Sequence, residues 1–214
     1  KREFPENTLQ AFAQAYRRGA NAIELDVHAT RDGVVVVHHD ASLPLTLGRM
    51  AHRAIAELDW DTVRAVDLGG GATVPSLADV LAATPESATV YVEIKGDGIE
   101  QLVADGIDAH EATCAVHSFD HRTVARMRTL APDLPRGILL DKAVADVTAA
   151  MAAVGARDVW PEWRLIDATL VDQVHASAGR VIAWTVNDRA AAQQLIAWGV
   201  DGLCTDDVRL LDGL

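Results

Sequence analysis

An α/β fold is predicted by three observations on this sequence. Strand-like runs centred at residues 93, 117, 139, 159, 182 and 203 follow one another at steps of 20 to 24 residues. Amphipathic segments with helix-capping residues fill most of the intervals between them. Two strands that are otherwise apolar also carry carboxylates on one face. Strand and helix units of this length are typical of an open doubly wound sheet or of a closed (β/α)8 barrel, and the periodicity alone leaves both open.

The composition favours one domain over residues 1–214, since 50% of the residues are hydrophobic and 23% are charged. The formal net charge of -12 argues against nucleic acid or an anionic membrane surface as the main partner. No apolar run approaches the ~18 residues that a transmembrane helix needs. A cytoplasmic location is favoured, with a secreted or periplasmic one left open because we expect the native N-terminus to lie upstream. The oligomeric state is left open as well.

The first elements are a helix over residues 7–18, with Asn7 as its N-cap, and a strand over residues 22–27. Side chains alternate along a strand, so Glu24 and Asp26 share one face while apolar residues occupy the other. Two buried carboxylates side by side are unfavourable unless a cation or strong donors stabilise them. This conflict indicates a metal site, and the alternative is an edge strand with a solvated polar face.

A hairpin is predicted next, because Asp32 and Gly33 form a strong two-residue turn signal before an apolar run. In that register Asp26 lies opposite His39 on the neighbouring strand, and cross-strand partners share a face. His39 is therefore expected on the carboxylate side, with His38 pointing away. A turn that is one residue longer would exchange the two histidines.

An irregular excursion is expected at about 41–89, containing a short helix that starts near Ser76. A second alternating strand over residues 90–95 follows it. Glu93 and Lys95 share the minority face of that strand, so charged side chains again occupy one face of a buried element.

The rest of the chain alternates between strands and helices. The expected strands are 115–119, 137–140, 157–160, 181–184 and 202–204, and the expected helices are 120–130, 142–154, 167–178 and 188–198. Without the hairpin arm there are seven candidate barrel strands, and the chain opens on a helix. A closed barrel therefore needs a first strand upstream of Lys1.

In a barrel, the C-terminal ends of the strands carry the site, and Glu24, Asp26, Glu93 and Lys95 all lie at or near such ends. Three carboxylates suit one hard divalent cation, Mg2+ or Ca2+. With Lys95 and that cation the site is formally neutral. An acidic protein can then accept an anionic substrate.

The ordered motifs resemble those of the glycerophosphodiester phosphodiesterase family along the whole chain. They are Pro5-Glu6-Asn7-Thr8-Leu9, Glu24-Leu25-Asp26-Val27, Asp32-Gly33, His39-Asp40, Val74-Pro75-Ser76-Leu77, Glu93-Ile94-Lys95, Ser118-Phe119, Trp184-Thr185-Val186-Asn187 and residues 202–206. The resemblance implies a TIM-like (β/α)8 barrel that hydrolyses small-molecule glycerophosphodiesters to sn-glycerol 3-phosphate and an alcohol.

The resemblance also implies roles for individual residues. Glu24, Asp26 and Glu93 would hold the divalent cation, and His39 would be one of two histidines that share acid and base catalysis. Lys95 would contact the phosphate and Trp184 would line the substrate pocket. The family's opening His-Arg-Gly motif is not in this sequence and would lie just upstream of Lys1.

Two alternatives to this activity are kept open. One is a related phosphodiesterase or lyase that forms a cyclic phosphate as its final product. The other is a barrel that binds phosphodiesters without catalysis. An enolase-like barrel is less consistent with the sequence, because here two of the three carboxylates share one strand.

Overall fold

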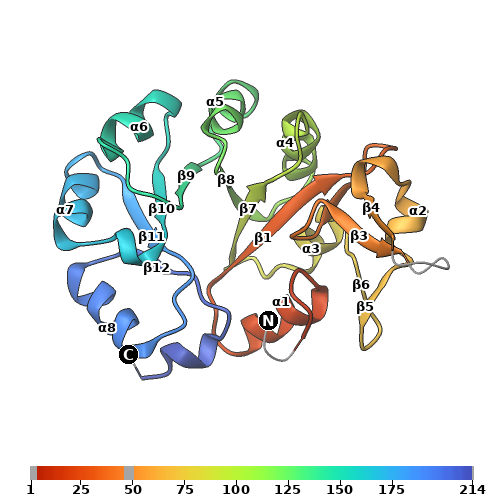
Figure 1. Cartoon of the computed structure of the whole chain (residues 1–214), viewed down its shortest axis with the longest axis horizontal. Coiled ribbons are helices and arrows are strands. Elements are labelled where there is room, and N and C mark those ends of the chain that lie inside the picture. Colours follow the sequence, from red (N-terminus) through yellow and green to blue (C-terminus); the bar gives the residue numbers. More distant parts are fainter. Residues whose placement is uncertain (1–3, 46–50, 214) are drawn as a thin grey trace. The chain divides into compact units, whose positions relative to one another are not determined.

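The computed structural model describes residues 4–45 and 51–213 and forms two compact units, Lys1–Cys114 and Ala115–Leu214. Both units combine strands with helices (Figure 1), as the sequence predicts. The single domain over residues 1–214 stays a prediction.

The first unit is built on a three-stranded sheet with β1 (Ala22–Ala29) in the middle. β2 (Val35–Val37) pairs with β1 antiparallel, and β7 (Thr89–Ile94) pairs with it parallel. The apolar residues Leu25 and Val27 of β1 are fully buried, which places Glu24 and Asp26 on the opposite face. The predicted strand and its two-faced character are confirmed.

The register of the β1 to β2 hairpin differs from the predicted one. Val27 pairs with Val37, so the ladder places Asp26 opposite His38, and the His38 backbone N–H donates to the Asp26 carbonyl over 2.9 Å. The loop holds three residues, because Thr30 N–H donates to the Val34 carbonyl and Gly33, at φ 84°, ends a turn that starts at Thr30. The prediction of a two-residue turn with Asp26 opposite His39 is wrong.

The first helix, α1 (Leu9–Arg17), is capped by Thr8 and not by Asn7. The Thr8 hydroxyl accepts from the Ala11 N–H at 3.3 Å, which satisfies one of the donors that a helix start leaves open. Asn7 precedes the cap with a left-handed φ of 57° and is buried. The predicted helix is confirmed, and the predicted cap is wrong.

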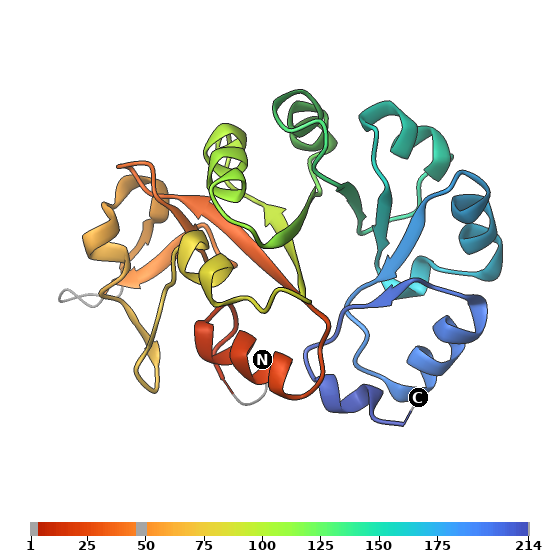
Figure 2. The same ribbon diagram turned by 180° about the vertical axis from the view of Figure 1, so that it is seen from behind.

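The excursion between β2 and β7 contains more regular structure than the sequence predicts. Figure 2 shows its two small hairpins from behind, in orange and yellow. Its elements are β3 (Ser42–Leu45), β4 (Ala51–Ala54), the 3-10 turn η1 (Ile55–Glu57), α2 (Trp60–Val63), β5 (Asp67–Gly69), β6 (Ala72–Thr73) and α3 (Leu77–Ala83). These elements enclose a small core of their own around Leu43, Ile55 and Val63.

One helix of the first unit, α4 (Glu100–Asp108), is missing from the prediction. Its N-cap is Ile99, which supplies no side-chain acceptor, and Gly106 lies inside the helix. Both features weaken the sequence signal for a helix. Burial of Val103 and Ile107 stabilises it instead.

The second unit is a parallel sheet whose neighbouring strands are connected by helices (Figure 1). The strands are β8 (Thr113–Ser118, which begins in the first unit), β9 (Arg136–Leu140), β10 (Asp158–Pro161), β11 (Arg180–Ala183) and β12 (Gly202–Leu203). The helices are α5 (His121–Leu130), α6 (Val147–Val154), α7 (Ala168–Ala176) and α8 (Arg189–Trp198), with the 3-10 turns η2 (Trp163–Leu165) and η3 (Val208–Leu211). An aspartate caps each of the four α-helices through a backbone N–H.

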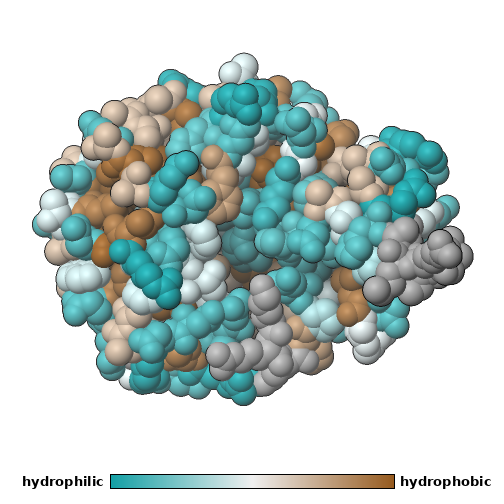
Figure 3. Space-filling model, in the orientation of Figure 1, coloured by the Kyte–Doolittle hydropathy of each residue, from teal (hydrophilic) through white to brown (hydrophobic). Residues whose placement is uncertain are grey.

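The surface visible in Figure 3 is mainly hydrophilic, with hydrophobic residues in small groups between the polar ones. Among the residues that the structure describes, no helix has the length and apolar character needed to cross a bilayer.

Candidate active site

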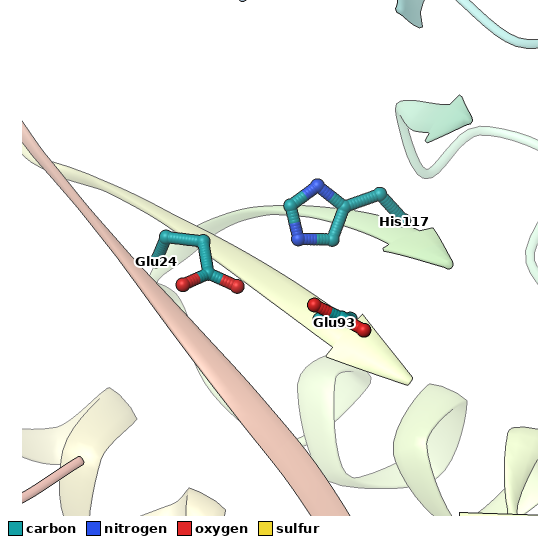
Figure 4. A group of neighbouring side chains, drawn as sticks. All are labelled: Glu24, Glu93 and His117. Carbon is teal, nitrogen blue, oxygen red and sulfur yellow. The ribbon is translucent and has the colours of Figure 1, made fainter. Parts of the chain in front are cut away.

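The pairing of β1 with β7 brings the predicted carboxylates together in the first unit. Asp26 is the direct neighbour of Glu93 in the parallel ladder, and Glu24 lies two residues before Asp26 on the same face. A carboxylate oxygen of Glu24 lies within 4.8 Å of one of Glu93. Figure 4 shows these two side chains on their neighbouring strands. The third side chain drawn there, His117, belongs to β8.

Lys95 follows the end of β7 and supplies a positive charge to this cluster. Its ammonium nitrogen lies 3.3 Å from Asp26 Oδ1 and 3.7 Å from Glu93 Oε1. The Lys95 side chain is 22% exposed, so the ion pairs are only weakly screened by water. Three carboxylates and one ammonium leave two formal negative charges in a largely buried space.

Burial and the neighbouring negative charge both raise the pKa of Glu24. Burial is the main cause that raises this pKa from 4.5 to about 8, and the Asp26 carboxylate raises it further. Lys95 and His39 act in the opposite direction. A site in which a carboxyl group stays protonated near neutral pH is one that a divalent cation would stabilise, because the cation replaces that proton. The donor set of three carboxylates therefore fits Mg2+ or Ca2+.

His39 lies beyond the end of β2, in the segment 38–40, where strand alternation no longer determines the direction of its side chain. Its Nδ1 is 2.8 Å from Asp40 Oδ1, and its side chain is 51% exposed. The hydrogen bond with His39 is the largest cause that lowers the pKa of Asp40. The charge of His39 also lowers the pKa of Glu24, so His39 lies within electrostatic reach of the carboxylates despite the shifted register.

His28 and Asp40 both contact His39, and the sequence analysis assigned no role to either residue. His28 follows Asp26 on the same face of β1, is buried, and has Nε2 at 3.3 Å from the His39 carbonyl oxygen. Burial lowers the pKa of His28, which favours the neutral ring. If the predicted strand over residues 22–27 is extended by two residues, its alternation places His28 on the face of Asp26. Asp40 could have been identified because it directly follows His39 in the sequence.

Trp184 belongs to the second unit, directly after β11. Its indole N–H donates to the Trp160 carbonyl over 2.8 Å, and its ring meets Phe119 edge to face at 5.4 Å. Phe119 is 41% exposed, so this aromatic pair borders solvent. His117 is buried in the same unit and packs edge to face on Trp160 at 4.4 Å.

The family match and the similar solved structures define the class of this chain as a phosphoric diester hydrolase with a TIM-like α/β fold. The model of the glycerophosphoryl diester phosphodiesterase family matches residues 1–210. The chain belongs to the glycerophosphoryl diester phosphodiesterase family. The TIM-like α/β fold class expected from the sequence is thereby confirmed.

Individual relatives agree with this assignment. The chain is 28% identical to a glycerophosphodiester phosphodiesterase of Caldanaerobacter subterraneus, over 98% of this chain and 92% of the relative. It is 33% identical to a Mycobacterium tuberculosis protein named "Probable glycerophosphodiester phosphodiesterase 2", over 97% of this chain and 84% of the relative. A phosphodiesterase of Oleispira antarctica, solved with the product sn-glycerol-3-phosphate, superimposes with a TM-score of 0.88 at 21% identity, covering 97% of this chain and 90% of that chain.

Proposed function

We propose that this enzyme hydrolyses glycerophosphodiesters to sn-glycerol 3-phosphate and an alcohol, with one divalent cation, Mg2+ or Ca2+, as cofactor. The observation that supports this most directly is the pairing of Asp26 with Glu93, with Lys95 between the two carboxylates. The family membership and the product bound to the Oleispira antarctica relative support the same reaction. The substrate is a small molecule, and a cytoplasmic location stays a prediction.

Glu24, Asp26 and Glu93 would hold the cation, since they present carboxylates from one face of two paired strands. A bound divalent cation would stabilise the negative charge that develops on the phosphoryl oxygens. Lys95 supports the same task, because its ammonium group lies beside two of the carboxylates and can approach a phosphate oxygen. Trp184 is proposed as a substrate-binding residue on the basis of the sequence motif.

His39 is proposed as the acid and base of this chain. Its Nδ1 is engaged by the Asp40 carboxylate, which leaves Nε2 as the ring atom that transfers a proton. The contact with Asp40 orients the His39 ring, and His39 would give a proton to the leaving alkoxide. The exposure of His39 gives a substrate access to that nitrogen.

Replacement of the histidine tests this proposal in the full-length protein. His39→Ala should lower kcat by about 10²- to 10⁴-fold, the usual contribution of general acid and base catalysis. His38→Ala is the matched control: its Nδ1 faces the Asp40 backbone, and we expect near-normal release of glycerol 3-phosphate. Circular dichroism and urea unfolding establish that both variants fold.

Near-normal turnover of His39→Ala would contradict the role given to His39, whatever the activity of His38→Ala. Phosphorus NMR of the products separates the alternatives in the same experiment. A cyclic phosphate as the final product would indicate the lyase, and metal-dependent turnover would exclude a barrel that only binds phosphodiesters.

A further inference from the structure

Asn7 occupies an unusual position just before α1. It is 7% exposed and adopts a φ of 57°, although the adjacent Thr8 already caps the helix. Asparagine is among the few residues with a side chain that tolerate this left-handed conformation. The helix itself makes no use of the Asn7 side chain, so its burial has another cause.

That cause is a pair of hydrogen bonds to Asp26. The Asn7 Nδ2 donates to Asp26 Oδ2 over 2.8 Å, and the Asp26 backbone N–H donates to Asn7 Oδ1 over 3.3 Å. In a strand, the N–H and the carbonyl of one residue point to the same side. The Asp26 carbonyl accepts from His38 N–H, so Asn7 satisfies the N–H at the place where β2 has ended.

We propose that Asn7 is a positioning residue that orients the Asp26 carboxylate toward the cation. This inference rests on the proposed function of Glu24, Asp26 and Glu93. One oxygen of Asp26 is held by the Asn7 amide, and the other is 3.3 Å from Lys95. The carboxylate therefore has a defined rotation, which a metal ligand needs and which partners in the outer shell commonly provide.

The amide group suits this role better than a cationic side chain. A lysine or an arginine would also donate to Asp26, but it would add a positive charge next to a cation site. The Asn7 amide donates without adding charge, and its oxygen accepts from the Asp26 N–H in the same orientation. Lys95 thus supplies the positive charge beside Asp26, and Asn7 adds none.

Asn7→Gly is the variant that tests the proposal, because glycine adopts the left-handed backbone readily and removes the side chain that carries the amide. Mg2+ and Ca2+ affinities would be measured on the full chain by isothermal titration calorimetry. We expect the affinity to fall about 10- to 100-fold, as for other losses of partners that orient a metal ligand. Urea unfolding of the metal-free protein reports separately on stability.

Thr8→Ala is the matched control. It removes the helix cap and the 2.7 Å bond from the Thr8 hydroxyl to the Pro5 carbonyl, and it leaves both Asn7 to Asp26 bonds in place. We expect this variant to lose stability and to keep the metal affinity. An equal loss of affinity in Thr8→Ala would overturn the inference, because the effect would then follow from the general stability of this segment.

Asp26→Asn separates failure of this inference from failure of the proposed function. Loss of binding in Asp26→Asn with unchanged affinity in Asn7→Gly would overturn the role of Asn7 alone. Absence of any binding of Mg2+ or Ca2+ by the unaltered chain would overturn the proposed metal site, and the inference with it. Weaker binding in Asn7→Gly and normal binding in Thr8→Ala would establish the positioning role.

Discussion

Metal affinity should depend on pH through Glu24. Burial and the neighbouring Asp26 raise its pKa to about 8 in the metal-free protein. A carboxylate must lose its proton before it binds a cation, so protons and metal compete for Glu24 below that pKa. The affinity should therefore fall about tenfold for each pH unit below the pKa of Glu24 and reach a plateau above it.

The raised pKa of Glu24 also makes the stability of the folded metal-free chain depend on pH. Between 4.5 and about 8 the folded metal-free chain holds a proton on Glu24 that the unfolded chain has released. The contribution of Glu24 to stability is therefore full below about pH 4.5 and is lost as the pH rises through the folded pKa. Addition of the cation should remove this loss, because the bound cation stabilises the ionised form.

Isothermal titration calorimetry in two buffers with different ionisation enthalpies measures both the affinity for Mg2+ and the number of protons that binding releases. Near pH 7 the binding of Mg2+ should release close to one proton. Glu24→Gln is the control, since its amide has no such proton to release. This variant should bind Mg2+ more weakly, and its affinity should no longer change with pH through residue 24. An affinity that is constant between about pH 6 and 8, with no proton release, would refute the reasoning about Glu24.

Two further predictions concern other parts of the first unit. Lys95→Met keeps the length of the side chain and removes its charge, so we expect kcat/KM to fall by at least about 10²-fold in a glycerol 3-phosphate release assay, with a folded protein by circular dichroism. A change of less than about threefold would exclude contact with the phosphate. Ser76→Ala removes the capping box with Asp79 at the start of α3, and the free energy of unfolding in urea should fall by about 1 kcal/mol without a change in metal affinity. An unchanged urea midpoint would show that this cap does not stabilise α3.

The regular elements could be predicted because their signals are local. The strands alternate in polarity, and Asp120, Asp167 and Asp188 mark helix starts that the structure confirms. α4 was missed because burial stabilises it, while its own residues supply neither a capping side chain nor a strong helix preference. Stability that arises from packing leaves little trace in a single sequence.

The carboxylate cluster was predictable for the same reason. Glu24, Asp26, Glu93 and Lys95 share the polar faces of two strands, and the parallel pairing of β1 with β7 brings them together as expected. Whether they act on a metal and a phosphate stays a prediction, which the experiments above address.

The register of the hairpin could not be predicted from the hairpin sequence alone. Asp32 and Gly33 are compatible with a two-residue turn and equally with a three-residue loop that ends on Gly33. The choice is made by Thr30, whose hydroxyl accepts from Val34 N–H and donates to Asp32, and by the contact of Asp32 with Trp60 N–H. That last contact joins residues 28 positions apart, so no pattern within the hairpin contains it.

The loop after β2 explains why His39 stays the proposed acid and base group although the predicted register is wrong. The register places the His38 backbone opposite Asp26, but β2 ends at Val37, and side-chain directions beyond that point follow the loop. In that loop Asp40 holds His39 Nδ1, and the buried His28 ring lies against the His39 carbonyl. His28 and Asp26 extend from one face of β1, so the strand that presents the carboxylates also supports the loop of the histidine. The proposed acid and base group and the proposed metal ligands are therefore expected to respond together to changes in β1.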